Sequence, residues 1–238
     1  RDSFWELLTS PDGPWVHVDE IEAYQERQEA IRQQREEQHN LFSNMVAVDP
    51  TNVDAMREYA RFAVDVKDTT LAMDMYQRVL RALPRDAGAL SDLGDLLTTR
   101  GSHDHAQQLF EAALELEPGN APAMRRYARL CDRGFGDCDA AYGMYAAALA
   151  ADPQDVESMS CMGGVCLQGD EQRRLEAESL FQRALSLDPN HANSLSQYAL
   201  LAHERSVAGP PNHPDARLAE ELYMRAVSLQ PSRAEVLS

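Results

Sequence analysis

Apolar residues recur along most of this chain at the three- and four-residue spacing of amphipathic helices, most clearly over residues 87–118. One apolar stripe ends at Gly101: Leu90, Leu93, Leu96 and Leu97. A second stripe runs up to Pro118: Ala106, Leu109, Phe110, Ala113 and Leu114. Because glycine ends helices and proline cannot continue a helix interior, the stretch predicts two short helices folded against each other. One such hairpin cannot bury both of its faces, so it needs neighbours of the same kind.

The same pattern returns at regular intervals. The closing proline recurs with gaps of 34, 34, 35, 36 and 42 residues: Pro50, Pro84, Pro118, Pro153, Pro189 and Pro231. When Ala87 is counted as position one, positions seven and eight hold a large and a small residue: Tyr59-Ala60, Leu93-Gly94, Tyr127-Ala128, Met162-Gly163 and Tyr198-Ala199. Each second helix carries an alanine and, four positions later, an aromatic residue: Ala72 and Tyr76, Ala106 and Phe110, Ala141 and Tyr145, Ala177 and Phe181, Ala219 and Tyr223. Five copies in register predict an array of five helical hairpins.

This arrangement of large and small residues resembles the tetratricopeptide-repeat family, whose helix–turn–helix unit has about 34 residues. The resemblance covers residues 51–231 and implies an all-α fold, a right-handed α-α superhelix preceded by a long N-terminal helix. The implied repeats are 51–84, 85–118, 119–153, 154–189 and 190–231, with the start of a sixth at 232–238. We expect one continuous solenoid in which each repeat contacts its neighbours. The pattern residues are core residues, so they specify architecture and no ligand.

The repeats also alternate in their aromatic residues. The first, third and fifth carry Tyr-Ala and a later Tyr, whereas the second and fourth carry Leu-Gly or Met-Gly and a later Phe. The alternation has two explanations, a series of alternating binding pockets or the packing of repeats in pairs. The second is favoured, because aromatic residues at helical spacing normally belong to the core.

Two segments precede the array. Residues 1–17 hold both tryptophans of the chain, and this aromatic segment is expected either to cap the first repeat or to dock on a partner. Residues 18–50 predict one long helix that packs on the first repeat through Phe42 and Met45. The first half of that helix has only a thin apolar stripe: Ile21, Tyr24 and Ile31. This favours a solvated helix over a dimer seam, because a coiled coil needs three or four sustained heptads.

The longer gaps between prolines place their additional residues between the two helices of a repeat. We therefore expect loops along one edge of the solenoid, in the third, fourth and fifth repeats: residues 133–140, 168–174 and 203–215.

The net charge of −17 argues against general binding to nucleic acid or to anionic membranes, since both need a basic face. No apolar run is long enough to predict a membrane span, and the first residues do not read as a signal peptide. We therefore expect an intracellular, cytoplasmic protein. The missing initiator methionine and the final residues, which stop inside a sixth repeat, lead us to expect a piece of a longer protein.

The four cysteines predict neither a metal site nor disulfides. Cys131 and Cys166 fall at a buried position of the repeat, Cys138 in a turn and Cys161 on the inner face of a first helix. No CxxC pair or zinc-ligand spacing is present, and the histidines of residues 103–105 lie in a polar turn that starts a second helix. The chain has no nucleotide-binding loop and no nucleophile beside a base, so the sequence predicts no enzyme activity, no cofactor and no metal.

In the tetratricopeptide family the first helices line a concave groove. The resemblance therefore implies partner contacts at the groove-facing positions: Arg57, Arg61, Asp92, Asp95, Arg125, Arg126, Arg129 and Arg133. The arginines of the third repeat form a basic spot, and arginines four residues apart on one helix face repel each other unless an anion compensates. That anion is either a carboxylate of the partner or the pair Asp92 and Asp95 on the neighbouring first helix, and the sequence leaves both open.

Some members of the family hold the C-terminal carboxylate of heat-shock chaperones in a five-residue clamp. The matching positions here are Arg57, Arg61, Asp92, Pro122 and Arg126. Only Arg126 matches in type, and an aspartate facing a carboxylate is repulsive, so the sequence argues against this ligand.

Three functions remain. The first is a scaffold that binds a peptide or helix of another protein in the groove, with an acidic group of the partner at the basic spot. The second is a structural spacer or self-association segment of a larger protein. The third is an accessory array of an enzyme whose catalytic domain lies outside these residues. The family resemblance favours the first.

Overall fold

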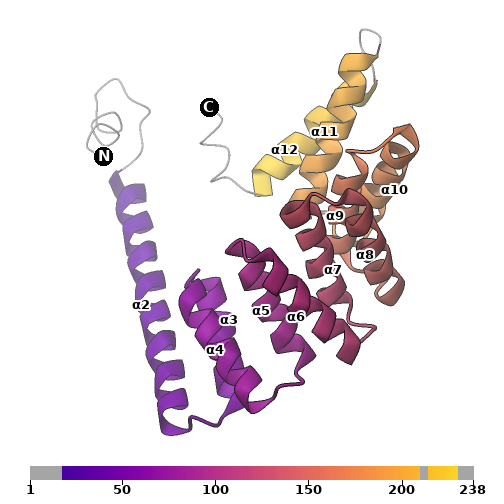
Figure 1. Cartoon of the computed structure of the whole chain (residues 1–238). Coiled ribbons are helices and arrows are strands. Elements are labelled where there is room, and N and C mark those ends of the chain that lie inside the picture. Colours follow the sequence, from indigo (N-terminus) through magenta and orange to yellow (C-terminus); the bar gives the residue numbers. More distant parts are fainter. Residues whose placement is uncertain (1–17, 210–213, 230–238) are drawn as a thin grey trace. The chain divides into compact units, whose positions relative to one another are not determined.

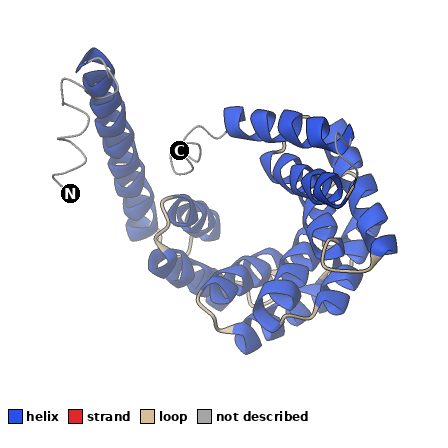
Figure 2. Ribbon diagram, turned by 90° about the horizontal axis from the view of Figure 1, so that it is seen from above, coloured by secondary structure: helices blue, strands red, loops and turns tan. Residues whose placement is uncertain are grey.

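The structure, a computed structural model, describes residues 18–209 and 214–229 of the chain. Within those ranges every regular element is a helix, and the two helices of each repeat pack more closely on each other than on other helices (Figure 1). Figure 2 shows the same helices joined by loops, with no strand among the described residues. The all-α fold is therefore confirmed. The aromatic segment at 1–17 and the start of a sixth repeat at 232–238 lie outside the described residues.

The contacts divide the chain into two compact units, Arg1–Ala82 and Leu83–Ser238, where the sequence predicts one continuous solenoid. We call these the N-terminal unit and the C-terminal unit. The division falls beside Pro84, which closes the first repeat, so one unit holds the long helix with the first repeat and the other holds the remaining repeats. Each unit is described by itself.

The N-terminal unit contains α2 (Val18–Val48), α3 (Val53–Asp65) and α4 (Thr69–Ala82). The long helix is continuous, as predicted, and it packs on α3 through Phe42, whose ring stacks on Tyr59 with 6.0 Å between centroids. Met45, which the sequence also places at this contact, is 41% exposed, and its neighbour Val46 is buried. Tyr24 is also exposed, which agrees with a solvated first half of this helix.

The C-terminal unit consists of four hairpins. Their helices are α5 (Ala87–Thr99) with α6 (His103–Leu116), α7 (Ala121–Arg129) and its extension η1 (Leu130–Phe135) with α8 (Cys138–Ala151), α9 (Val156–Cys166) with α10 (Glu171–Leu187), and α11 (Ala192–Ala208) with α12 (Pro214–Leu229).

The first helices begin at side chains that cap them. Asp86, Asn120 and Asp155 each accept a hydrogen bond from the backbone N–H three residues later, at α5, α7 and α9. These caps satisfy amide groups that a helix start leaves without partners. Gly101 follows α5 with a φ of 79°, a left-handed conformation that glycine adopts without steric cost. The residues before and after a first helix therefore set where that helix begins and ends.

The alternation of aromatic residues corresponds to ring stacks at alternate junctions between repeats. The Phe110 ring of α6 stacks on Tyr127 of α7 at 5.8 Å, and the Phe181 ring of α10 stacks on Tyr198 of α11 at 6.2 Å. Both phenylalanines are fully buried. Phe42 and Tyr59 repeat the arrangement in the N-terminal unit. The stack therefore forms where an even-numbered repeat, or the long helix, meets the odd-numbered repeat that follows.

The glycines of the even repeats make room for these rings. A Cβ placed on Gly94 would lie 3.0 Å from the Phe110 ring, and a Cβ on Gly163 would lie 2.5 Å from the Phe181 ring. Both distances are shorter than carbon atoms tolerate without a shift, so the aromatic ring occupies the space that an alanine would fill. The glycine of each even repeat therefore accompanies the Phe of the same repeat, because it leaves room for that ring.

The prediction of loops in the longer repeats was wrong for most of the added residues. In the third repeat the extra residue widens the end of the first helix into a π-helical turn, Leu130–Phe135. In the fourth, residues 171–174 belong to α10, and in the fifth, residues 203–208 belong to α11. Helical extensions keep the backbone groups hydrogen-bonded, whereas a loop needs other partners for them. The turn after η1 is closed by a hydrogen bond from Asp137 N–H to Cys131 O at 2.8 Å. Residues 210–213 lie outside the described residues.

Candidate partner-binding site

Two arginines of the predicted basic spot are held by acidic side chains of the neighbouring first helix. Arg126 Nη2 lies 2.6 Å from Asp92 Oδ1, and Arg126 also donates to the Ser91 hydroxyl at 2.9 Å. One helical turn further on, Arg129 forms an ion pair with Asp95. These contacts join α7 to α5. Of the two compensating anions that the sequence left open, the neighbouring aspartates are therefore present for these two arginines.

Burial and charge act in opposite directions on Arg129. Burial alone would lower the pKa of its guanidinium, but the charge of Asp95 and its hydrogen bond raise that pKa above the usual value. Arg129 therefore stays fully charged in its half-buried position.

Arg125 points to the other side of the third repeat. Its Nη1 lies 2.8 and 3.0 Å from the two carboxylate oxygens of Asp155, the residue that caps α9. Asp155 is thereby shared between a helix cap and an ion pair. The basic spot is thus split, with Arg125 engaged toward the fourth repeat and Arg126 and Arg129 engaged toward the second.

The remaining predicted residues differ in their surroundings. Arg57 and Arg61 lie on α3 in the N-terminal unit, where Arg61 pairs with Glu58 at 2.8 Å. Arg133 lies in η1 at the end of the first helix of the third repeat, where it is exposed. In the part of the chain that the structure describes, no carboxylate lies within ion-pair distance of Arg133. The C-terminal unit thus brings together six of the eight predicted residues and leaves one arginine available.

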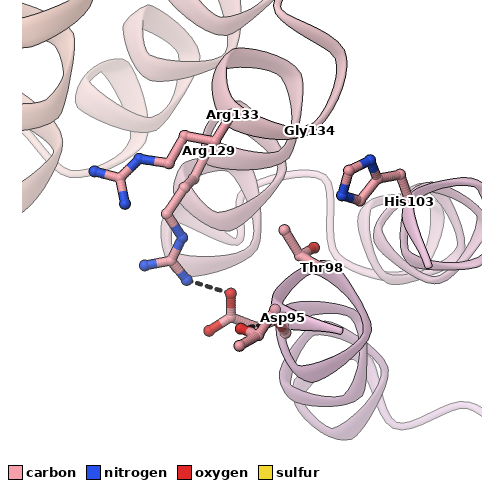
Figure 3. Close-up of a pocket in the computed structure, with 7 residues that line it drawn as sticks. Asp95, Thr98, His103, Arg129, Arg133 and Gly134 are labelled. Atoms are coloured by element: carbon pink, nitrogen blue, oxygen red, sulfur yellow. Dashed lines mark hydrogen bonds and ion pairs between the residues drawn. The ribbon is translucent and has the colours of Figure 1, made fainter. Parts of the chain in front are cut away.

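Arg133 lines a pocket of about 430 Å³ that we call the arginine pocket. Its lining residues come from α5, the start of α6, α7 and η1: Asp95, Thr98, Thr99, His103, Arg129, Arg133 and Gly134. Figure 3 shows the Arg129 guanidinium turned toward Asp95, with Thr98 between Asp95 and His103. The Arg133 guanidinium extends to the side of the pocket away from His103. The pocket thus has hydroxyl, imidazole and guanidinium groups and one carboxylate.

The π-helical turn forms one wall of this pocket. A Cβ on Gly134 would lie 2.6 Å from Leu130 Cδ1 and 3.3 Å from the His103 ring, so this close packing needs glycine. The Phe135 ring meets the His103 ring edge-on, with 5.9 Å between centroids. The extra residue of the third repeat therefore brings η1 against the start of α6. The sequence signal was the gap of 35 residues, which we had assigned to a loop.

Arg133 also lines a second pocket, of about 290 Å³. We call it the amide pocket, after the glutamines among its lining residues: Asp132, Arg133, Tyr145, Cys161, Gly164, Val165, Gln168 and Gln197. Sequence reasoning missed it. A signal was present at Gly164, because position nine carries a side chain in each of the other repeats: Arg61, Asp95, Arg129 and Leu200.

Cys131 and Cys166 are buried, as the sequence predicts, whereas Cys138 begins α8 and does not lie in a turn. The two buried cysteines are free of disulfides, and burial raises the pKa of the Cys166 thiol to about 11. Cys161 also has a pKa of about 11, because burial and the nearby charge of Glu157 disfavour its thiolate. In the described ranges no three His, Cys, Asp or Glu side chains come together as metal ligands. None of the described helices combines the length and apolarity needed to cross a bilayer.

Comparison with known proteins identifies the repeat. Residues 97–160 match the model of a tetratricopeptide repeat, and this stretch runs from the end of α5 to the start of α9. This stretch is a tetratricopeptide repeat. A protein named CTR9 homolog from Arabidopsis thaliana is 27% identical over 129 residues, which are 54% of this chain but only 12% of that protein.

Solved structures show the same fold. Yeast Tom70 superposes with a TM-score of 0.68 at 16% identity, over 84% of this chain and 41% of its own chain. YrrB, described as a tetratricopeptide-repeat protein with an unusual peptide-binding site, superposes with a TM-score of 0.52 at 18% identity, over 80% of this chain and 92% of its own. Proteins built from these repeats generally mediate protein–protein interactions. The side chains of the first helices are therefore the candidates for partner contacts.

Proposed function

We propose that the C-terminal unit binds an extended segment of a partner protein and holds a carboxylate of that segment in the arginine pocket. Arg133 supplies the principal contact, and Arg129, Thr98 and His103 form the surroundings of the carboxylate. This function is binding and not catalysis. The other predicted contacts, Asp92, Asp95, Arg125 and Arg126, then act as the framework that fixes the arginines.

The observation that carries this proposal is the difference between Arg133 and its neighbours. Arg125, Arg126 and Arg129 each have a carboxylate partner within the C-terminal unit, and Arg133 has none among the described residues. An exposed guanidinium beside a pocket is well suited to a carboxylate, since its planar donors match the two oxygens.

The charges of the arginine pocket favour a single carboxylate. Its two arginines and one aspartate sum to a formal charge of about +1. The whole chain carries −17, so a strongly acidic partner would be repelled at longer range. A segment with one or two acidic residues therefore fits better than a polyacidic tract. The description of YrrB as a peptide-binding repeat protein supports the class of ligand.

The test uses a phage-displayed library of random twelve-residue peptides and the whole chain as bait. Selections are run on the unaltered protein, on Arg133→Glu and on Arg85→Glu. Arg85 is a matched control, because it is an exposed arginine of the C-terminal unit that lines neither pocket. We expect the unaltered protein and Arg85→Glu to enrich peptides that contain Asp or Glu, and Arg133→Glu to lose that enrichment. Selection of the same acidic peptides by Arg133→Glu, or of none by the unaltered protein, would overturn the proposal.

A further inference from the structure

We propose that the amide pocket is a second subsite, which takes the side-chain amide of an Asn or Gln in the same partner segment. This inference rests on the proposed function, because Arg133 lines both pockets and so places the amide next to the bound carboxylate. The partner motif is then an acidic residue with an Asn or Gln close to it in sequence.

The amide pocket exists because the fourth repeat lacks a side chain at one groove-facing position. Gly164 stands in the interior of α9, where glycine is less favourable than alanine. A Cβ on Gly164 would lie 2.5 Å from Gln197 Oε1, so the space next to α9 is filled in part by the glutamine of α11. The position is compatible with a large residue in this fold, since the fifth repeat carries Leu200 there.

Gln197 contains an acceptor without a donor. Its Nε2 donates to Asn193 Oδ1 at 2.9 Å, but its Oε1 is buried and receives no hydrogen bond from the described residues. A buried acceptor of this kind is unusual and is normally satisfied by protein, water or ligand. Because Gln197 lines the amide pocket, an N–H group bound there can supply the missing donor.

The rest of the lining selects an uncharged polar group. Asp132 and Arg133 contribute opposite charges, so the pocket has no net charge to attract an ion. The raised pKa of about 11 keeps the Cys161 thiol neutral, and burial likewise raises the pKa of the Tyr145 hydroxyl. A side-chain amide offers two donors and an acceptor in one plane. Its donors suit Gln197 Oε1 and the Asp132 carboxylate, and its acceptor suits the Arg133 guanidinium.

The test uses the same peptide library with two further baits, Gly164→Leu and Gln197→Leu. The first fills the pocket with the side chain that the fifth repeat carries, and the second removes the acceptor without changing the backbone. We expect the unaltered protein to enrich Asn or Gln at a fixed distance from the acidic residue. Both variants should keep the enrichment of Asp and Glu and lose that of Asn and Gln. Because the two variants act on different helices, a folding defect in one leaves the other to decide.

A synthetic peptide from the selection gives the quantitative arm. Replacing its Asn or Gln with Ala should weaken binding to the unaltered protein about ten-fold and leave binding to Gly164→Leu unchanged. The inference is overturned if acidic residues are enriched without an amide neighbour, if a hydroxyl, apolar or charged side chain takes that place, or if both variants select the same amide. In those cases the arginine pocket stands. Loss of the acidic enrichment itself removes both proposals.

Discussion

The second and third repeats form one pair and the fourth and fifth form another, and the two pairs share a core contact but differ in the polar layer above it. Each pair stacks a fully buried Phe of its earlier repeat on a Tyr of its later one, at 5.8 and 6.2 Å. The first helices of the earlier pair are joined by ion pairs: Arg126–Asp92 and Arg129–Asp95. Those of the later pair are joined by hydrogen bonds: His191–Glu157 and Asn193–Ser160.

The comparison separates the core contacts that stabilise the array from the polar side chains that can contact a partner. A hairpin must cover its apolar face with the next one, so the Phe–Tyr stack and the glycine that admits the Phe recur in both pairs. The polar layer carries no such requirement, because most of these side chains are partly exposed to solvent, Ser160 excepted. Differences in that layer are therefore the place where binding specificity is expected.

The largest expected effect concerns the shared core. Phe110→Ala and Phe181→Ala should each lower the free energy of unfolding by about 3–5 kcal/mol, since each removes a fully buried ring and leaves a cavity. Phe135→Ala is the control, because this ring is 44% exposed, and a loss of about 0.5 kcal/mol is expected. Urea denaturation followed by circular dichroism measures all three. Equal losses at Phe110 and Phe135 would contradict the pairwise core.

The glycines offer a sharper version of the same comparison. Gly163→Ala should cost about 1–3 kcal/mol of unfolding free energy and Gly94→Ala less, since the alanine Cβ would lie 2.5 Å from one ring and 3.0 Å from the other. Gly143→Ala, in the interior of the second helix α8, has no atom within 4 Å of its new Cβ. It should stabilise by about 0.5–1 kcal/mol through helix propensity. Thermal unfolding of the three variants decides the order, and a stabilised Gly163→Ala would be inconsistent with it.

The ion pairs of the earlier pair should matter little for stability and more for binding. Asp95→Asn removes the charge that pairs with Arg129, and because both side chains are about one-third exposed we expect a loss of about 0.5–1 kcal/mol. The same change removes the one carboxylate of the arginine pocket, so an acidic peptide should bind a few-fold more tightly. Unchanged affinity with intact stability would show that the carboxylate binds elsewhere. Calorimetric titration and urea denaturation provide the two readings.

The smallest effect is a pH dependence at the stack of the earlier pair. Burial and a hydrogen bond to Glu111 raise the pKa of Tyr127 from about 10 to about 12. A raised folded-state pKa means that the neutral phenol contributes stability in full below pH 10, which is lost as the pH rises towards 12. The thermal midpoint of the unaltered protein should therefore fall more steeply over that range than that of Tyr127→Phe. Parallel curves would remove Tyr127 as the cause.

The sequence predicted the core better than the site. Residues such as Phe110 and Tyr127 are fixed by the repeat pattern, because any neighbour must bury them in the same register. The ion pairs of Arg126 and Arg129 could be predicted from the sequence, since Asp92 and Asp95 occupy the same positions one repeat earlier.

The two pockets could not be predicted from the sequence, for physical reasons. An extra residue between helices reads equally well as a loop or as a wide helical turn, and only the second choice places Gly134 against His103. In the sequence, Gly164 indicates only a residue of low helix propensity. Its closeness to Gln197 is known from the structure alone. Arg133 could not be singled out from the sequence either, because the ion pairs of Arg125, Arg126 and Arg129 are known only from the structure.

The most direct measurement is the affinity of one selected acidic peptide for three proteins, by isothermal titration calorimetry. The unaltered protein and Arg85→Glu should bind it equally, and Arg133→Glu should bind it at least about ten-fold more weakly, because a guanidinium–carboxylate contact becomes a repulsion. All three should unfold at the same temperature, since Arg133 is exposed and unpaired among the described residues. Equal affinity of Arg133→Glu and the unaltered protein would contradict the account.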